Sequence, residues 1–473
     1  MGDATVAGVT TATVSRHEGV RAQAAALAAG EVTAMSLVEE TLAGIEAANP
    51  RLGAFRVVRA DSARADAAEA DRRLADGSAA GPLLGVPVAI KDDTDLAGET
   101  TPFGCGGALQ AKEADAEIVT RLRAAGAIVV GKTNTPELGQ WPFTEGPGFG
   151  AVRNPYDTRR TPGGSSGGAA AAVAAGLVAG AVGSDGAGSV RIPAGWCGLV
   201  GIKPTRDRVP TGPEGEWFHG LTCHGPLARD VGDAALLLDV LAGTSTRYAD
   251  AAARGAAQGP GPLRIGVSFR TPWFVPGKVD PQVRAATRRI AGVLRDLGHH
   301  VVDIEPAHEL AGLLFLPRGT NGVRRALAAM GPDATVERRT REHAFLGALL
   351  GGRVLAGARR LEPFLARRMA RVYEQVDVLL VPTTAKPALR IGQFDGRRWL
   401  GTGPAIEAAC PFAFPWNVVG WPGVNVPAGL DAGGVPLGVQ LLGRADDEEL
   451  LIALAAQLET VERWDLRRPP AGP

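Results

Sequence analysis

Cysteine, tyrosine and an excess of charge of either sign are all scarce in this sequence. Its 473 residues include four cysteines and three tyrosines, and 50 basic residues balance 50 acidic ones. The cysteines, at positions 105, 197, 223 and 410, form neither a C-x-x-C pair nor a disulfide pattern, which predicts reduced thiols in a cytoplasmic protein. The balanced charge gives no electrostatic reason to expect nucleic acid or an anionic membrane as a partner.

Long hydrophobic runs are missing as well. The longest run of small apolar residues, 169–183, is shorter than the roughly 20 residues that span a bilayer. Residues 1–14 lack the cationic start and apolar core of a signal peptide. With 45% hydrophobic and 21% charged residues, the composition predicts a soluble globular protein.

What the sequence does contain is an alternation of short apolar segments with amphipathic ones. Apolar runs at 86–90, 127–130 and 263–267 predict strands, and periodic stretches such as 115–125 and 281–297 predict helices. A helix expected at 36–49 should end before Pro50. The alternation predicts an α/β fold with a large mixed β-sheet covered by helices on both faces.

We find no internal repeat and no long linker, so residues 1–473 are expected to form a single domain. The arginine-rich segment 313–372 is helical in character, with a less definite pattern.

Two glycine-rich turns flank an alanine-rich stretch at 161–193. The first turn presents Ser165 and Ser166, and the second presents Ser189. Glycine lets the backbone approach other groups closely, and alanine helices have little side-chain bulk. The stretch would hold hydroxyl and free N–H groups in a cramped space, which suits acyl transfer.

Two short motifs suggest other functions. Residues 126–133 match the G-x-x-x-x-G-K-[ST] phosphate loop, but Ala-Ile-Val-Val in its middle should itself be a strand. Residues 163–167 match the G-x-S-x-G nucleophile elbow, although none of the seven histidines has a neighbourhood typical of a catalytic imidazole. A nucleotide-binding protein, a Ser–His–Asp hydrolase and a non-catalytic scaffold therefore stay open at this point.

A serine can also be activated by lysine, and Lys91 directly follows a predicted buried strand. Burial lowers the pKa of a lysine and makes the neutral amine available as a base. The alternative is a structural ion pair between Lys91 and Asp92 or Asp93. The residues alone leave these two interpretations about even.

Taken together, these segments resemble the amidase signature family of serine hydrolases. The resemblance covers most of the chain and rests on residues 85–92, 125–134, 162–175, 183–193, 197–205, 225–243, 381–384, 417–429 and 436–443. It implies an amidase signature fold, hydrolysis of C–N bonds other than peptide bonds, and no metal or organic cofactor. It also implies that the variable segment 313–372 is inserted near the mouth of the active site.

The resemblance further implies a Ser–cis-Ser–Lys triad. Lys91 would be the base, Ser165 the bridging serine after a cis peptide bond from Gly164, and Ser189 the nucleophile. The backbone N–H groups expected to bind the oxyanion belong to Gly186, Ala187, Gly188 and Ser189. Ser166, Asp185 and Arg191 are expected to support the site. Ala187 stands where many members have glycine, and a positive φ there would strain alanine.

The substrate class is less defined. Trp141, Phe143, Phe414 and Trp416 are candidates for an apolar pocket that suits aryl or alkyl groups. The first-choice function is hydrolysis of small amides, with carbamates (urethanes) and esters as further substrates and a monomer or homodimer as the assembly. A glutamine-hydrolysing amidotransferase A-type subunit is the alternative within the family, disfavoured because the chain lacks a tyrosine-rich stretch.

Overall fold

An eleven-stranded mixed sheet runs through the whole protein, as seen in a computed structural model that describes residues 15–78, 81–107, 109–213, 215–272, 275 and 278–470. The strand order is β1-β3-β2-β6-β8-β7-β12-β13-β11-β9-β10, and a two-stranded ribbon, β4-β5, lies apart from it. The strands are β1 (Phe55–Val58), β2 (Pro87–Lys91), β3 (Ile128–Thr133), β4 (Glu145–Gly146), β5 (Gly150–Ala151), β6 (Gly180–Asp185), β7 (Val200–Lys203), β8 (Cys223–Ala228), β9 (Arg264–Val267), β10 (His300–Asp303), β11 (Val378–Pro382), β12 (Gly423–Leu430) and β13 (Pro436–Leu442). The predicted α/β class with a large mixed sheet is confirmed.

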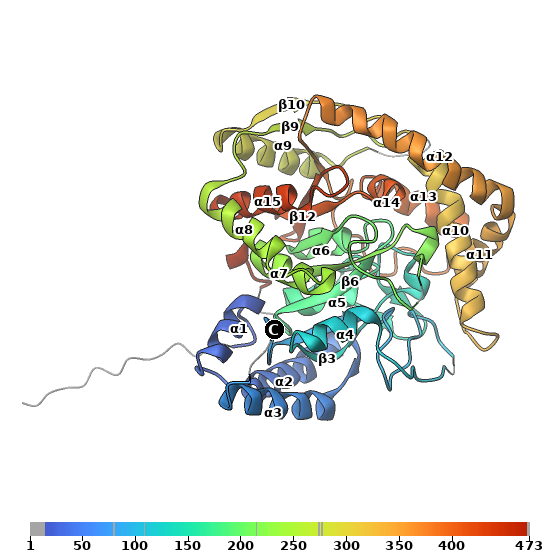
Figure 1. Cartoon of the computed structure of the whole chain (residues 1–473). Coiled ribbons are helices and arrows are strands. Elements are labelled where there is room, and N and C mark those ends of the chain that lie inside the picture. Colours follow the sequence, from blue (N-terminus) through green and yellow to red (C-terminus); the bar gives the residue numbers. More distant parts are fainter. Residues whose placement is uncertain are drawn as a thin grey trace, which may run out of the picture.

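Helices cover the sheet in groups (Figure 1). One group, α5 and α6, packs on β6, β7 and β12, and another, α7, α8 and α15, packs around β7, β8 and β12. The helices are α1 (Val20–Ala28), α2 (Ala34–Leu52), α3 (Ala60–Ala75), α4 (Glu117–Ala124), α5 (Gly167–Ala174), α6 (Arg191–Cys197), α7 (Val231–Ala242), α8 (Arg247–Gln258), α9 (Pro281–Asp296), α10 (Ala311–Ala329), α11 (Arg338–Leu349), α12 (Gly352–Ala370), α13 (Trp399–Ala409), α14 (Phe414–Val419) and α15 (Glu448–Glu462). Short 3₁₀ turns are η1 (Glu137–Gly139), η2 (Trp217–His219), η3 (Arg371–Glu374) and η4 (Trp464–Leu466).

The alanine-rich helix α5 lies at the centre of the molecule, where all of its residues are buried. A Cβ atom on Gly168 would come within 2.5 Å of the Ala54 carbonyl oxygen and the Asn134 nitrogen. Small residues are therefore required where α5 approaches its neighbours, and this close packing fixes the turn that precedes the helix.

Helices α10, α11 and α12 gather at one side of the molecule (Figure 1). They make up most of segment 313–372, and Phe315 and His343 from this segment line the central cavity. Among the described residues, no helix is both long and apolar enough to cross a membrane.

Two local predictions are wrong. Helix α2 continues through Pro50 to Leu52 and ends at Gly53 with φ of 63°, because Pro50 lies in the last turn, where little helix is left to disrupt. Strand β3 continues to Thr133, since Gly131, Lys132 and Thr133 pair with β1 and β2. The sequence that matches a phosphate loop is therefore mostly strand.

Candidate active site

Lys91 is the last residue of β2, a central strand between β3 and β6, and its side chain is completely buried. Its Nζ atom lies 2.7 Å from Ser165 Oγ, 2.7 Å from Ser184 Oγ and 2.8 Å from an Asp93 carboxylate oxygen. The structure therefore shows both a contact of Lys91 with Ser165 and the ion pair that was the alternative interpretation, with Asp93 as the partner. Asp92 points elsewhere and pairs with Lys132 at 3.0 Å.

Ser165 follows a cis peptide bond from Gly164. A Cβ atom on Gly164 would meet the Trp141 carbonyl oxygen at 2.5 Å, so the approach to Ser165 has room only for glycine. The next residue ties the two serine turns together. The Ser166 N–H donates to the Ser189 carbonyl at 3.1 Å, and its hydroxyl donates to the Ser184 carbonyl at 3.2 Å.

Ser189 lies in the turn between β6 and α6, and Asp185 holds that turn. The Asp185 carboxylate accepts the N–H groups of Gly188 at 2.7 Å and Val190 at 3.2 Å. Arg191 Nε lies 3.0 Å from the same carboxylate, and both side chains are fully buried. Burial opposes ionisation of Asp185, but the Arg191 guanidinium outweighs it and holds the pKa of this carboxyl far below its usual range.

The Gly188 contact corrects the expected oxyanion hole. Since the Gly188 N–H already donates to Asp185, it is not free to bind an oxyanion. The N–H groups of Gly186, Ala187 and Ser189 have no hydrogen-bond acceptor among the described residues. Positive φ falls on Gly188, at 111°, and not on Ala187, so alanine is accommodated without backbone strain.

The ionisation of Lys91 depends on two opposing effects. Burial lowers its pKa, and the neighbouring Asp93 carboxylate raises it, with burial the larger effect. Burial also opposes ionisation of Asp93, but Lys91, His224 and the Ser184 hydroxyl together outweigh it and lower the pKa of Asp93. The net result is a Lys91 pKa below that of a free lysine, because the side chain is completely buried.

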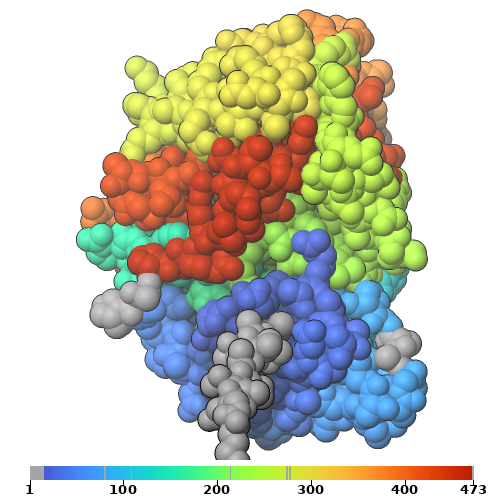
Figure 2. Space-filling view, turned by 90° about the vertical axis from the view of Figure 1, so that its left-hand side faces the viewer, coloured from blue at the N-terminus to red at the C-terminus, as the bar shows by residue number. Residues whose placement is uncertain are grey.

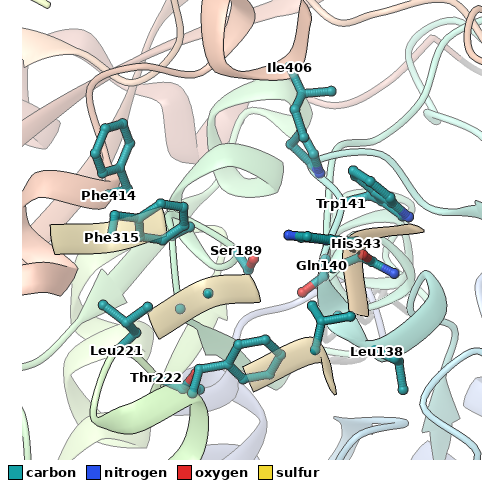
Figure 3. A pocket seen from close by; sticks show the side chains of 18 of the residues that line it. Leu138, Gln140, Trp141, Ser189, Leu221, Thr222, Phe315, His343, Ile406 and Phe414 are labelled. Atoms are coloured by element: carbon teal, nitrogen blue, oxygen red, sulfur yellow. Dashed lines mark hydrogen bonds between the residues drawn. The ribbon is translucent and has the colours of Figure 1, made fainter. Parts of the chain in front are cut away.

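A largely apolar cavity opens onto Ser189 (Figure 3). Ser189 is only 9% exposed and lines this cavity together with Ser165, Ser184 and Asp93. In the close-up view Phe315, Phe414 and Leu221 lie to one side of Ser189, and Trp141, Gln140 and His343 lie to the other. One wall beside Ser189 is therefore apolar, and the other carries polar side chains next to Trp141.

Of the four predicted pocket residues, Trp141 and Phe414 line the cavity, whereas Phe143 and Trp416 do not. Phe143 belongs to the same hydrophobic cluster as Trp141, where it stacks on Phe394. Trp416 is buried in another cluster, and its indole N–H donates to the Gly443 carbonyl at 3.1 Å. The short aromatic motifs could not tell which ring faces the cavity and which packs behind it.

His343 and Glu407, two titratable groups in the cavity wall, were not predicted as site residues. His343 Nδ1 lies 2.6 Å from Gln140 Oε1, and Gln140 donates its amide to Thr340, so Nδ1 of His343 carries the proton. Burial lowers the pKa of His343 to about 3, which leaves Nε2 as a neutral hydrogen-bond acceptor. Glu407 has no hydrogen bond or ion pair with the described part of the chain, and burial raises its pKa.

In the part of the chain that the structure describes, the phosphate-loop match and the histidines do not form the sites that their motifs suggested. Lys132, in the phosphate-loop match, is buried and donates to the Thr100 carbonyl and the Thr101 hydroxyl besides pairing with Asp92. No described histidine hydrogen-bonds to Ser165 or Ser189 through its ring. Within the described ranges no group of three His, Cys, Asp or Glu side chains could hold a metal ion.

A sequence model of the Amidase family matches residues 36–452. The chain belongs to the amidase family. It is 49% identical over 450 residues to the putative amidase AmiA2 of Mycobacterium bovis, covering 94% of this chain and 93% of that protein.

Solved structures of amidase-family enzymes have the same fold. The structure of a 6-aminohexanoate cyclic dimer hydrolase matches with a TM-score of 0.87 and 34% identity, covering 97% of this chain and 99% of the other. A bacterial aryl acylamidase of the amidase signature family matches with a TM-score of 0.82 and 26% identity, covering 96% and 99%. Membership of this family supports hydrolysis of carbon–nitrogen bonds as the activity.

Proposed function

We propose that this protein is a serine amidase in which Ser189 is the nucleophile, Ser165 relays protons and Lys91 is the base. The observation that carries the proposal is the 2.7 Å contact between Lys91 Nζ and Ser165 Oγ, buried below the cavity that Ser189 lines. A lysine that is buried next to a serine hydroxyl is the arrangement needed for proton transfer without histidine.

The chemistry follows from these positions. Neutral Lys91 takes the proton of Ser165 while Ser165 takes that of Ser189, and Ser189 Oγ bonds to the amide carbonyl carbon. The N–H groups of Gly186, Ala187 and Ser189 are available for the oxyanion, the type of contact that usually contributes most to such catalysis. The proton then returns through Ser165 to the leaving nitrogen as the C–N bond breaks, and water hydrolyses the acyl-enzyme by the reverse route.

The cavity supports small amides with aryl or alkyl groups as substrates. Its wall is formed mainly by apolar side chains such as Trp141, Phe315 and Phe414, which suit a neutral substrate better than free glutamine with its two charged groups. The relatives that act on a cyclic amide and on aryl acylamides agree with this class. Carbamates and esters present the same carbonyl to Ser189, so we include them as further substrates.

The test compares an aryl amide, an aryl carbamate and glutamine as substrates of the wild type and of Ser189→Ala and Lys91→Ala. We expect Ser189→Ala to abolish hydrolysis and Lys91→Ala to lower kcat by about 10²–10⁴-fold, the usual contribution of a general base. Phenylmethylsulfonyl fluoride should modify Ser189, which mass spectrometry of peptides would locate.

The matched control is Ser268→Ala, a buried serine that does not line the cavity. It should retain wild-type hydrolysis. An unmodified Ser189, or full activity in Ser189→Ala, would refute the proposed nucleophile. Faster turnover of glutamine than of the aryl amide would favour the amidotransferase subunit instead.

A further inference from the structure

Asp93 lies two residues beyond Lys91, and its carboxylate turns back onto the lysine amine. Besides the 2.8 Å contact with Lys91 Nζ, Asp93 Oδ2 accepts the Ser184 hydroxyl at 2.5 Å. Lys91 Nζ also contacts Ser184 Oγ at 2.7 Å, which closes a triangle of three buried polar groups. None of these contacts is needed for the proton relay from Ser189 to Lys91, so they require another explanation.

The number of hydrogen atoms on Lys91 Nζ explains these contacts. A protonated amine has three N–H donors, whereas a neutral amine has two donors and one lone pair. Lys91 Nζ has three close partners, namely Ser165, Ser184 and Asp93. Asp93 is an acceptor when ionised, and Ser184 gives its own proton to Asp93, so both take an N–H from Lys91. The lone pair of the neutral amine is then left pointing at Ser165.

We propose that Asp93, together with the Ser184 hydroxyl, is a positioning residue that directs the Lys91 lone pair toward Ser165 and stabilises the ammonium formed when Lys91 accepts the proton. This inference rests on the proposed serine mechanism. The proton moves from Ser189 through Ser165 to Lys91 as the Ser189 oxygen–carbon bond forms, and it returns by the same route as the C–N bond breaks. Asp93 itself exchanges no proton, so it acts through Lys91 alone.

The Asp93 carboxylate should also lower the activity at low pH. A negative charge within 3 Å favours protonated Lys91, so the neutral base is populated only at higher pH than it would be without Asp93. The acidic limb of the activity profile should therefore depend on Asp93.

The other charged groups near Lys91 do not replace Asp93. Asp185 is neutralised by its ion pair with Arg191. His224, opposite Ser184 on β8, is buried, and burial lowers its pKa so that the ring is neutral near physiological pH. Its Nδ1 atom has no hydrogen-bond partner in the described part of the chain.

The experiment measures two rates against pH for the wild type, Asp93→Asn and Asp92→Asn. One rate is kcat/KM for an aryl amide, and the other is inactivation by phenylmethylsulfonyl fluoride, which needs no C–N cleavage. For Asp93→Asn we expect the acidic limb of both profiles to move toward lower pH by about one to three units, the usual effect of a close opposite charge. The plateau of kcat/KM should fall at least about tenfold, because the developing ammonium loses its counter-charge.

Asp92→Asn is the matched control, because Asp92 is the adjacent buried carboxylate but pairs with Lys132 and Arg56. It should unfold at a lower temperature and keep the wild-type acidic limb. If Asp93→Asn fails to fold, Asp93→Ser keeps a hydrogen-bonding oxygen without the charge and should move the limb in the same direction.

An acidic limb that stays in place in the Asp93 variants, or moves equally in Asp92→Asn, would overturn the inference. Failure of the proposed function looks different, because the wild type itself would then neither hydrolyse the amide nor become modified at Ser189.

Discussion

Gly188 turns the backbone between the Asp185 carboxylate and Ser189 with φ of 111°, a conformation that L side chains rarely adopt. A Cβ atom at this position would lie 2.5 Å from Ala413 Cβ and 2.9 Å from Ile192 Cδ1. Space and backbone conformation therefore both require glycine, directly before the proposed nucleophile.

We expect Gly188→Ala to displace the Ser189 turn and lower kcat by about 10²–10³-fold, the loss typical of a disturbed oxyanion site. Steady-state hydrolysis of an aryl amide measures it. Gly292→Ala on helix α9 is the control and should keep the wild-type kcat, because a Cβ atom there meets nothing within 4 Å and Gly292 does not line the cavity. Wild-type kcat in Gly188→Ala would show that the turn tolerates a side chain and that our account of it is wrong.

At the level of single elements, helix α10 forms a wall of the cavity. Phe315, Leu316, Gly319, Thr320 and Val323 of this helix line it. Buried Arg318 anchors α10 to three other segments, since it donates to the His219 carbonyl at 2.6 Å, to the Val418 carbonyl at 3.0 Å and to Glu362 at 2.7 Å. The position of the wall thus depends on a residue that does not itself line the cavity.

Replacing Arg318 by methionine keeps an unbranched apolar stem but removes the guanidinium and every one of these hydrogen bonds. We expect Arg318→Met to lower the free energy of unfolding by about 3–5 kcal/mol, as for other broken buried ion pairs, and to raise KM through the loosened wall. Thermal unfolding and steady-state kinetics measure the two effects. Arg324→Met, on an exposed position of the same helix, should change neither, and equal unfolding temperatures of the two variants would contradict the anchoring role.

For the molecule as a whole, the C-terminal helix α15 joins distant parts of the chain. It packs on α7 and α8, and the space-filling view shows the C-terminal residues between the N-terminal part and residues near 300 (Figure 2). Glu459 of α15 accepts the Val231 N–H at the start of α7 through both carboxylate oxygens, at 3.1 Å each. Burial, and next the charge of Asp230, raise the pKa of Glu459 to about 8.

This raised pKa makes stability dependent on pH. The folded state holds a proton on Glu459 that the unfolded chain releases near its usual pKa of about 4.3, so the contribution of Glu459 to stability declines as pH rises toward about 8. We expect Glu459→Gln to be more stable than the wild type by about 2 kcal/mol at pH of about 9 and to lose that advantage at pH of about 5.

Thermal unfolding across this pH range measures the difference. Glu449→Gln, on the same helix but at a surface pair with Arg247, should show no such gain in stability over the wild type as pH rises. A constant offset between Glu459→Gln and the wild type at every pH would contradict the explanation.

Local sequence was enough to indicate the family and the α/β class and to single out Lys91, Ser165 and Ser189 as candidate site residues, because these inferences depend on local periodicity and on short motifs. The same local signals predicted a buried strand at 86–90 directly before Lys91, and β2 covers Pro87–Lys91, with Lys91 as its last residue. They failed at the end of α2, because Pro50 lies in the last turn and the helix continues through it to Leu52.

Only the tertiary structure decided which partner each polar group and each aromatic ring has. Asp185 takes the Gly188 N–H, and Lys91 has both a serine and Asp93 beside it. His343 reaches the cavity from an α-helix about 200 residues beyond Gln140, whereas Phe143, two residues from Trp141, packs behind the wall. Local sequence sets which element forms, but these contacts join segments far apart in the chain, and their geometry exists only once the sheet has brought the segments together.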